Sequence, residues 1–501
     1  MAQAMILLDV TIVNVALPTI QQELHVVPAN LEWVVGAYTL VLAALILVGG
    51  TLGDRFGRKR IFLAGLCIFT LASAGCALSQ DDVQLIAFRA LQGVGGAAMA
   101  ALTLSILIHA YDAEHRTSAV GTWAALGGLG FGLGPVLGGL LIRAFDWSAI
   151  FWVNVPIGLA CGAVTVLAVE ESKDPQARRL DRLGALLAAA GLFLLTFALI
   201  ESSRQSWASA VVLGCLAGAA VALGGFATWE RRAESPMVPP ALVRNRRFVS
   251  ANTVFGLMYF ALSGMFFWVT LYFQNLRGWS ALETGLSWLL LNGPFLAASL
   301  SVGRLARRYN GRLLIGVGSL IAAAGMVGLT LLSADTAFWL AAVGYLLIGL
   351  GFGVAVPLVS SQVMGDVPSA YAGTGSGILN SARQVGASVG IAIMGTIGVT
   401  IATHVWDSKV PTLPPAVQAT ANGLGQQVAG GQISQVVSQV GAAAQEPATD
   451  SFVAGYHWAM AAGSVALAAA GATALIGLRP KPAARPPITP TRPGVLQAEE
   501  G

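Results

Sequence analysis

Three charged side chains interrupt long apolar stretches, and they are the residues whose types could do chemistry. Asp9 lies in the first such stretch, Arg89 within 83–108 and Arg383 within 371–402. An ionised group costs about 2.5–3.5 kcal/mol at the centre of a membrane-spanning helix, so such residues are usually functional. A lone acid at this depth can take up and release a proton.

Asp9 and Arg89 are predicted to act together as the proton-coupling site. In a helix that rises 1.5 Å per residue, Asp9 lies roughly 16 Å from the outer end of its apolar run and Arg89 roughly 9 Å from the outer end of its own. An extended arginine side chain could bridge most of that difference. The alternative is a structural ion pair that only holds two helices together.

The elements that must position these groups are membrane helices. Of the 501 residues, 55% are apolar and only 10% are charged, whereas soluble domains carry about 25% charged residues. The mean hydropathy is +0.72. A bilayer core requires about 20 apolar residues per helix. Runs of this kind predict fourteen helices, near 3–22, 33–53, 61–79, 83–108, 117–142, 149–169, 182–201, 208–228, 248–273, 282–303, 312–332, 337–362, 371–402 and 452–478.

The predicted fold is therefore an all-α polytopic membrane protein with its helices arranged as six, two and six. Residues 1–170 form an N-terminal six-helix bundle, and 171–247 hold two inserted helices with their linkers. Residues 248–478 form a C-terminal six-helix bundle that includes a long outer loop, 403–451. The proline-rich tail, 479–501, is expected to be disordered. The first run has only eight residues before Asp9, so we expect either a natural start upstream of Met1 or a short first helix.

Lysine and arginine residues predict the orientation, because they favour cytoplasmic loops. With the N-terminus inside, the gaps assigned to the outer side hold only Arg143, Arg204, Arg277 and Lys409 of the 28 basic residues. Both termini are therefore expected in the cytoplasm. No basic cluster is interleaved with aromatic residues, so nucleic-acid binding is not expected. The four cysteines have no metal-ligand spacing, and no metal site is expected.

The loop after the second helix combines glycines with charges in a way that simple topology does not explain. Its glycines permit a tight turn and close helix approach, and its acid can lie at a helix N-terminus. The string resembles the loop 2–3 signature of the major facilitator superfamily, which implies a gating role for Gly50, Asp54, Arg55, Gly57 and Arg58.

Other strings resemble the fourteen-helix drug:proton antiporter branch of this superfamily. They are the first-helix string from Leu8 to Pro18, the fourth-helix string from Arg89 to Gly96, and the fifth-helix motif that marks exporters. That motif contains Gly130, Gly134, Pro135, Gly138 and Gly139. Because three of its glycines recur every four residues, we expect them to form a smooth stripe that packs against a helix of the other half.

The sequence also departs from the family pattern. Trp147-Ser148-Ala149 stands where the branch usually has Trp-Arg-Trp, so whatever that arginine does is absent. The loop from Gly303 to Arg312 is similar to the loop after the second helix but lacks its acid. This degenerate copy supports an ancient six-helix repeat with two helices inserted between the copies.

The resemblance implies a proton-coupled antiporter that exports lipophilic or cationic drugs or antibiotics by alternating access. It implies a monomer in the cytoplasmic membrane that uses protons and needs no cofactor. The alternative on the same fold is an importer of a small metabolite. A membrane enzyme is disfavoured because the five histidines are scattered, and a channel because no filter is visible. Polar and aromatic residues at membrane depth are the cavity candidates: Trp33, Tyr38, Gln92, Trp123, Asn292, Asn380, Arg383 and Gln384.

Overall fold

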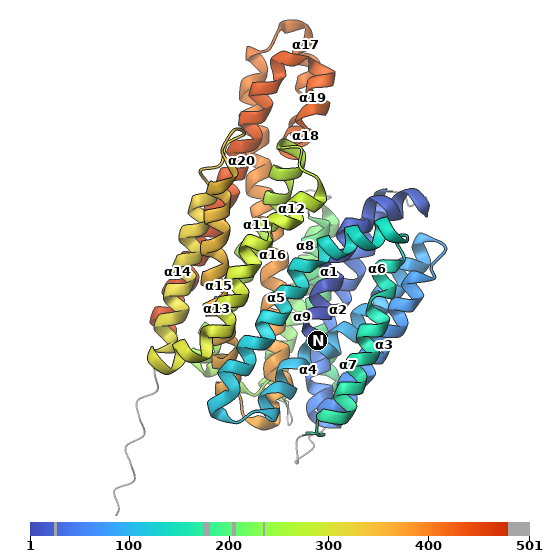
Figure 1. The fold of residues 1–501 in the computed structure, drawn as a ribbon, viewed down its shortest axis with the longest axis vertical. Helices are drawn as coiled ribbons and strands as arrows, with labels where there is room; N and C mark the ends of the chain where they lie inside the picture. The colour runs from blue at the N-terminus through green and yellow to red at the C-terminus, as the bar shows by residue number, and fades with distance from the viewer. Residues whose placement is uncertain (25–27, 174–180, 203–206, 234–235, 479–501) are drawn as a thin grey trace, which may run out of the picture.

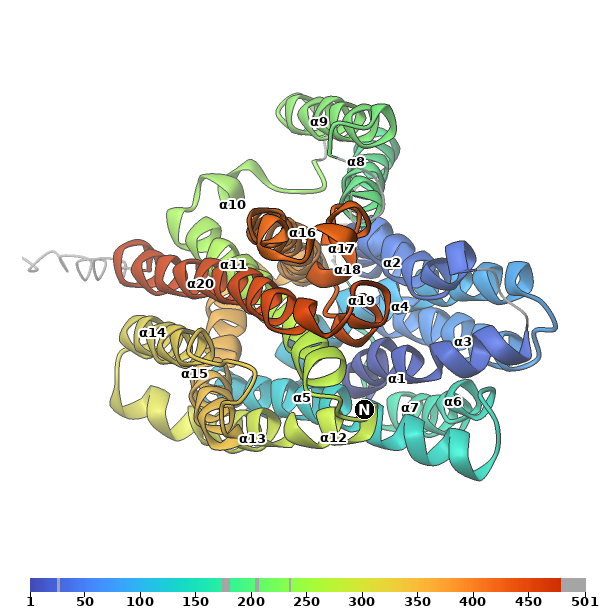
Figure 2. The ribbon, with the colours of Figure 1, turned by 90° about the horizontal axis from the view of Figure 1, so that it is seen from above.

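The computed structural model describes residues 1–24, 28–173, 181–202, 207–233 and 236–478. Within these ranges the chain is helical and contains no strand (Figure 1). Long helices lie side by side in two groups, one from each end of the chain, and two further helices flank them (Figure 2). The predicted tail lies outside the described residues.

The N-terminal group consists of α1 to α7. Helix α4 packs against α2 and α3, while α5 packs against α1. The predicted sixth helix is divided at Val153 into a short piece and a long one. The bounds are α1 Ala2–Glu23, α2 Pro28–Phe56, α3 Arg58–Ala77, α4 Asp82–Ala110, α5 Ala113–Ala144, α6 Ala149–Trp152 and α7 Asn154–Ala168.

The C-terminal group consists of α11 to α20. Helix α15 packs against α13 and α14, and α16 packs against α11 and α20. A π-helical turn, Tyr272–Leu276, extends α11. A single residue separates α12 from α13. The bounds are α11 Arg246–Leu271, α12 Ala281–Ser287, α13 Leu289–Arg308, α14 Gly311–Leu329, α15 Phe338–Asp366, α16 Ala372–Lys409 and α20 Gln445–Gly477.

Helices α8 (Arg182–Glu201) and α9 (Ala210–Glu230) form the inserted pair. They pack on each other, and α8 also contacts α2 of one group and α16 of the other. Helix α9 lies outside α8 at the periphery (Figure 2). A short helix, α10 (Pro240–Arg244), follows. In the linker between α9 and α10, the amides of Met237 and Val238 donate hydrogen bonds to the Glu230 carboxylate.

Local signals begin several of these helices where the sequence changes from loop to apolar run. Asp81 accepts a hydrogen bond from the Gln84 amide, and Ser209 accepts one from the Val212 amide. Ser280 and Glu283 form a capping box at the start of α12. Each side chain satisfies a backbone donor that the first helical turn would otherwise leave without a partner.

Thirteen helices of the described residues are long and apolar enough to cross a bilayer. In α1 the corresponding apolar part, Ala2–Leu17, is shorter. The multi-pass helical architecture is therefore confirmed, while the count of fourteen and the arrangement of six, two and six stay predictions.

The predicted outer loop, 403–451, is largely helical in the structure. Helix α16 continues to Lys409, α20 starts at Gln445, and between them lie α17 (Pro415–Ala421), α18 (Gly425–Ala429) and α19 (Ile433–Val440). Trp406 is fully buried there and donates to the Ala421 carbonyl at 2.9 Å. Burial of such apolar side chains stabilises a packed subdomain. The segment was predicted as a loop because it is rich in glutamine, alanine and glycine. We call this end of the molecule, at the top of Figure 1, the cap end.

Candidate functional site

The two charges predicted to pair lie within the N-terminal group and form a buried ion pair. Arg89 Nη1 lies 2.6 Å from Asp9 Oδ2, and neither side chain has exposed surface. The guanidinium also donates from Nε to the Val34 carbonyl at 2.8 Å and from Nη1 to Gln92 Oε1 at 2.6 Å. Its carbon lies 4.4 Å from the centre of the Tyr38 ring. These contacts fix the arginine between α1, α2 and α4.

The second oxygen of Asp9 is also fully engaged. Gln92 Nε2 donates to Asp9 Oδ1 at 2.9 Å, and Asn154 Nδ2 donates to the same oxygen at 3.1 Å. Both amides also donate to Ser73 Oγ, at 2.7 and 3.3 Å. Three side-chain donors thus surround one carboxylate and connect α1 to α4 and α7. Among the described residues, no hydrogen-bond partner is found for two buried atoms of this network, Arg89 Nη2 and Asn154 Oδ1.

Asp54 lies at the end of the molecule opposite the cap. It accepts hydrogen bonds from the backbone amides of Gly373 and Thr374, each at 2.8 Å, at the first turn of α16. Arg58 donates to the same carboxylate from Nε at 2.9 Å and from Nη2 at 2.6 Å. A carboxylate at a helix N-terminus is stabilised by free amides and by the helix dipole. The acid therefore joins the first group of helices to the second.

The rest of this loop is shaped around the same junction. Gly57 has a φ of +110°, which only glycine adopts easily, and a Cβ there would meet the Glu171 carboxylate. Glu171 accepts from the amides of Lys59 and Arg60 at the start of α3. A Cβ on Gly50 would meet the Gly373 carbonyl, so α2 and α16 cross in close contact. Arg55 lies with its guanidinium carbon 5.2 Å from the Phe56 ring centre.

The prediction for the α5 glycine stripe is wrong about the partner. Cβ atoms at Gly130, Gly134 and Gly138 would meet Ala4, Thr11 and Ile12, all on α1 of the same half. Gly139 has open space around it. The helix faces the other half with a different set of positions, where a Cβ would meet α13: Gly121 against Ser299, Gly128 against Phe295, and Gly132 against Asn292. Pro135 lies against Gly285 of α12. The four-residue spacing identified a close-packed face but could not say which neighbour covers it.

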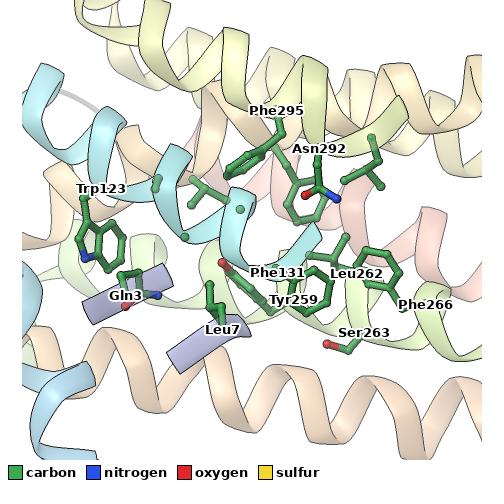
Figure 3. Close-up of a pocket in the computed structure, with 16 residues that line it drawn as sticks. Gln3, Leu7, Trp123, Phe131, Tyr259, Leu262, Ser263, Phe266, Asn292 and Phe295 are labelled. Carbon is green, nitrogen blue, oxygen red and sulfur yellow. The ribbon is translucent and has the colours of Figure 1, made fainter. Parts of the chain in front are cut away.

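A cavity of about 100 Å³ lies between the two groups of helices. Figure 3 shows its wall, which is mainly aromatic and aliphatic and includes two amide side chains, Gln3 and Asn292. Among the described residues, no carboxylate or basic side chain lines it. Gln3 Oε1 and Trp123 Nε1 are buried and have no hydrogen-bond partner in the described part of the chain. The residues that matter below are Gln3 and Leu7 of α1, Trp123 and Phe131 of α5, Tyr259 and Phe266 of α11, and Asn292 and Phe295 of α13.

The structure divides the eight predicted cavity residues among several places. Trp123 and Asn292 line the cavity. Tyr38 and Gln92 instead surround the buried ion pair, and Trp33 packs on Phe197 of α8, 5.7 Å between ring centres.

The remaining three lie on α16. Asn380 donates to the Ala100 carbonyl of α4 at 3.1 Å, a further direct hydrogen bond between the groups of helices. Arg383 lies behind the cavity wall, its guanidinium carbon 5.8 Å from the Tyr259 ring centre. Gln384 is half-buried beside it.

Several site residues were missed from the sequence. Ser73 and Asn154 were not predicted to contact Asp9, since single polar residues in apolar helices usually serve helix packing. Gln3 was missed although it lies six residues before Asp9 in the same run. Its position in an apolar stretch was a usable signal. Glu171 lies more than a hundred residues from the loop it caps, and no local pattern points to it.

Comparison with known proteins places the chain in its family. The family model described as Major Facilitator Superfamily matches residues 1–391. The tetracenomycin C resistance and export protein of Streptomyces glaucescens is 32% identical over 490 residues, which cover 96% of this chain and 91% of that protein. The methylenomycin A resistance protein of Streptomyces coelicolor is 36% identical, covering 78% of this chain and 82% of that protein.

Solved structures agree on the fold. The human organic anion transporter MFSD10 superposes with a TM-score of 0.61 at 16% identity, covering 93% of this chain and 97% of that one. A bacterial homologue of the lysosomal transporter Spinster gives a TM-score of 0.57 at 16% identity, with 95% of both chains covered. A buried acid–arginine pair, a loop that joins two helical groups and a cavity between them accompany these similarities. This chain therefore belongs to the Major Facilitator Superfamily.

Proposed function

We propose that this protein exports lipophilic drugs or antibiotics across the cytoplasmic membrane in exchange for protons. The observation that carries the proposal is the aromatic cavity between the two groups of helices, together with a separate buried acid on α1. The relatives named above as resistance and export proteins support the direction of transport. Export by a single copy with both termini in the cytoplasm is part of the proposal.

The transport cycle follows from the junction opposite the cap. We take that end as cytoplasmic because the basic loops gather there. The Asp54 contact with α16 closes the cavity on this side in the present conformation. Opening requires that two backbone hydrogen bonds and the close contact of Gly50 with Gly373 be broken together. Exchange between the two closures exposes the cavity to one side at a time.

Proton coupling is assigned to Asp9. While Asp9 is ionised, its charge balances that of Arg89, and the carboxylate connects α1 to α4 and α7. Protonation removes the counter-charge and leaves a buried guanidinium unpaired, which is costly in a low-dielectric site. The helices that share the acid must then rearrange, because Arg89 needs another partner. A proton that enters from outside thus changes the packing of α1, which also lines the cavity through Gln3 and Leu7.

The cavity chemistry narrows the substrate. Its wall of Trp123, Phe131, Tyr259, Phe266 and Phe295 suits planar aromatic compounds. No acid among the described residues lines it, and the Asp9 carboxylate is enclosed by its own donors. A positive charge, Arg383, lies against the Tyr259 ring of the cavity wall. Neutral or weakly acidic aromatic compounds therefore fit better than the cationic compounds that the sequence left open.

Transport into everted membrane vesicles tests the proposal. Respiration acidifies the vesicle interior, so an exporter should accumulate a neutral aromatic dye such as Nile red in a way that an uncoupler abolishes. Ethidium, a permanent cation, should be accumulated less well. Proton-independent uptake, or flux in the opposite direction, would instead support the importer on the same fold.

A further inference from the structure

Pro135 creates an unsatisfied carbonyl in the middle of α5. Proline has no backbone N–H, so the carbonyl four residues earlier loses its helical donor. That carbonyl belongs to Phe131. A buried carbonyl without a donor is costly, and a native structure usually supplies a replacement.

The replacement comes from α1. Thr11 Oγ1 lies 3.1 Å from the Phe131 carbonyl oxygen, in a buried position where the two helices touch. The approach requires Gly134, because a Cβ at that position would overlap the Thr11 hydroxyl. The adjacent glycine and proline thus have complementary roles: Pro135 removes the helical donor, and Gly134 admits the donor that takes its place.

The same hydroxyl has competing acceptors within its own helix. Thr11 Oγ1 lies 3.1 Å from the Leu8 carbonyl and 3.3 Å from the Leu7 carbonyl. A hydroxyl has one proton and donates one full hydrogen bond at a time. It can therefore join α1 to α5 or release α5 and bond within α1, without leaving its place.

The two ends of this link are a proton site and a cavity wall. Thr11 is two residues beyond Asp9 on α1. Phe131 lines the cavity, and its ring lies 5.0 Å from that of Phe266 and 6.3 Å from that of Trp288, centre to centre. The hydroxyl is therefore a polar contact between α1 and the residue that carries this ring.

We propose that Thr11 is a positioning residue that couples the state of Asp9 to the cavity by donating to the carbonyl that Pro135 frees. This proposal rests on the proposed function in one respect: it takes Asp9 as the residue that binds the coupled proton. When α1 moves after Asp9 changes its charge, the hydroxyl exchanges the Phe131 carbonyl for an acceptor of its own helix. The bend of α5, and with it the Phe131 ring, then changes with the proton.

A double-mutant cycle on the full chain in proteoliposomes tests the link. Thr11→Val keeps the shape and removes the donor, and Pro135→Ala returns an N–H to the Phe131 carbonyl. Thr39→Val is the matched control, because the Thr39 hydroxyl bonds to carbonyls of its own helix, at the same 3.1 and 3.3 Å, and to no other helix among the described residues. Thr11→Ser keeps the donor and serves as the rescue. The readouts are proton-driven dye efflux and the protons released per dye bound.

We expect Thr11→Val to lower efflux about fivefold, the factor that corresponds to about 1 kcal/mol. Thr11→Ser and Thr39→Val should stay within about twofold of wild type, the usual error of additivity. In the Pro135→Ala background, Thr11→Val should cost less than about twofold. An equal cost in both backgrounds, or failed rescue by serine, overturns the link. Absence of proton-driven efflux from the wild type would refute the proposed function instead.

Discussion

The Asp9 carboxylate on α1 accepts a hydrogen bond from Arg89 on α4 at 2.6 Å, and neither side chain has any exposed surface. The pair lies inside the N-terminal group of helices rather than in the cavity between the groups. Under the proposed function, the proton site and the substrate site are therefore separate in this conformation. Any exchange between them must pass through the helices that both touch, and α1 is one of them.

Neutralising one member of the pair should be more damaging than neutralising both. Arg89→Met leaves a buried carboxylate without its partner, and breaking a buried pair in this way costs about 3–5 kcal/mol. The double variant Asp9→Asn with Arg89→Met removes both charges and should recover much of that loss. Thermal unfolding of the purified proteins measures the effect. A double variant no more stable than Arg89→Met would count against the pair as the source of the cost.

Asp54→Asn should impair efflux while the protein still reaches the membrane. The amide loses the charge that Arg58 and the first turn of α16 stabilise, and one of its two polar atoms becomes a donor facing other donors. Asp335→Asn, at an exposed position, is the control. Dye efflux normalised to membrane content is the measurement. Normal efflux from a well-expressed Asp54→Asn protein would remove this acid from the gate.

Gly50→Ala should disfavour the closed junction at the same end. Its Cβ would overlap the backbone of Gly373, which cannot move without displacing α16. Gly36→Ala on the same helix meets only Trp33, at an ordinary 3.7 Å, and is the matched control. The measurement is the labelling of a cysteine introduced near the junction by a thiol reagent added on the cytoplasmic side. Labelling should increase in Gly50→Ala and not in Gly36→Ala. Equal labelling of both variants would contradict the close crossing of α2 and α16.

Gly134→Ala should reduce efflux because its Cβ overlaps the Thr11 hydroxyl and separates α1 from α5. Gly139→Ala lies on the same helix in open space and should behave like wild type. Overpacking of this kind typically costs about 1–3 kcal/mol. A drug-susceptibility assay in an efflux-deficient host, at matched expression, distinguishes the two. If Gly139→Ala were the more harmful change, the assignment of the two glycine faces would be wrong.

Much of the architecture could be predicted because membrane burial leaves a direct record in sequence. Long apolar runs mark the helices, and a charge within them marks a site that compensates for its cost, as Asp9 and Arg89 do. The position of Asp54 at a helix N-terminus was expected from its place in a glycine-framed loop. In the segment between α16 and α20, residues 428–440 have the amphipathic pattern of a short helix, and α19 lies there. The rest of the folded cap was not predicted, because α17 and α18 consist largely of glutamine, alanine and other small residues and resemble a loop in composition.

What could not be predicted depends on which helix faces which. The spacing of the α5 glycines indicates close packing. It does not show that Gly130 faces α1 and Gly128 faces α13, which requires the three-dimensional arrangement. Likewise, Tyr38 and Gln92 have the polarity of cavity residues, yet both turn toward Arg89. Rotation of a helix about its axis by a quarter turn would exchange a cavity residue with a residue that packs inside its own group. Because both sides of the helix are apolar, little in the sequence determines this rotation.

The most direct test of the account is the proton released when substrate binds to the purified protein. In weakly buffered detergent solution, addition of a neutral aromatic substrate should release protons from the wild type, because binding and protonation of Asp9 favour different arrangements of α1. The Asp9→Asn variant should bind the same compound, as followed by quenching of tryptophan fluorescence, but release no protons. Undiminished proton release from a variant that still binds substrate would contradict Asp9 as the coupling site.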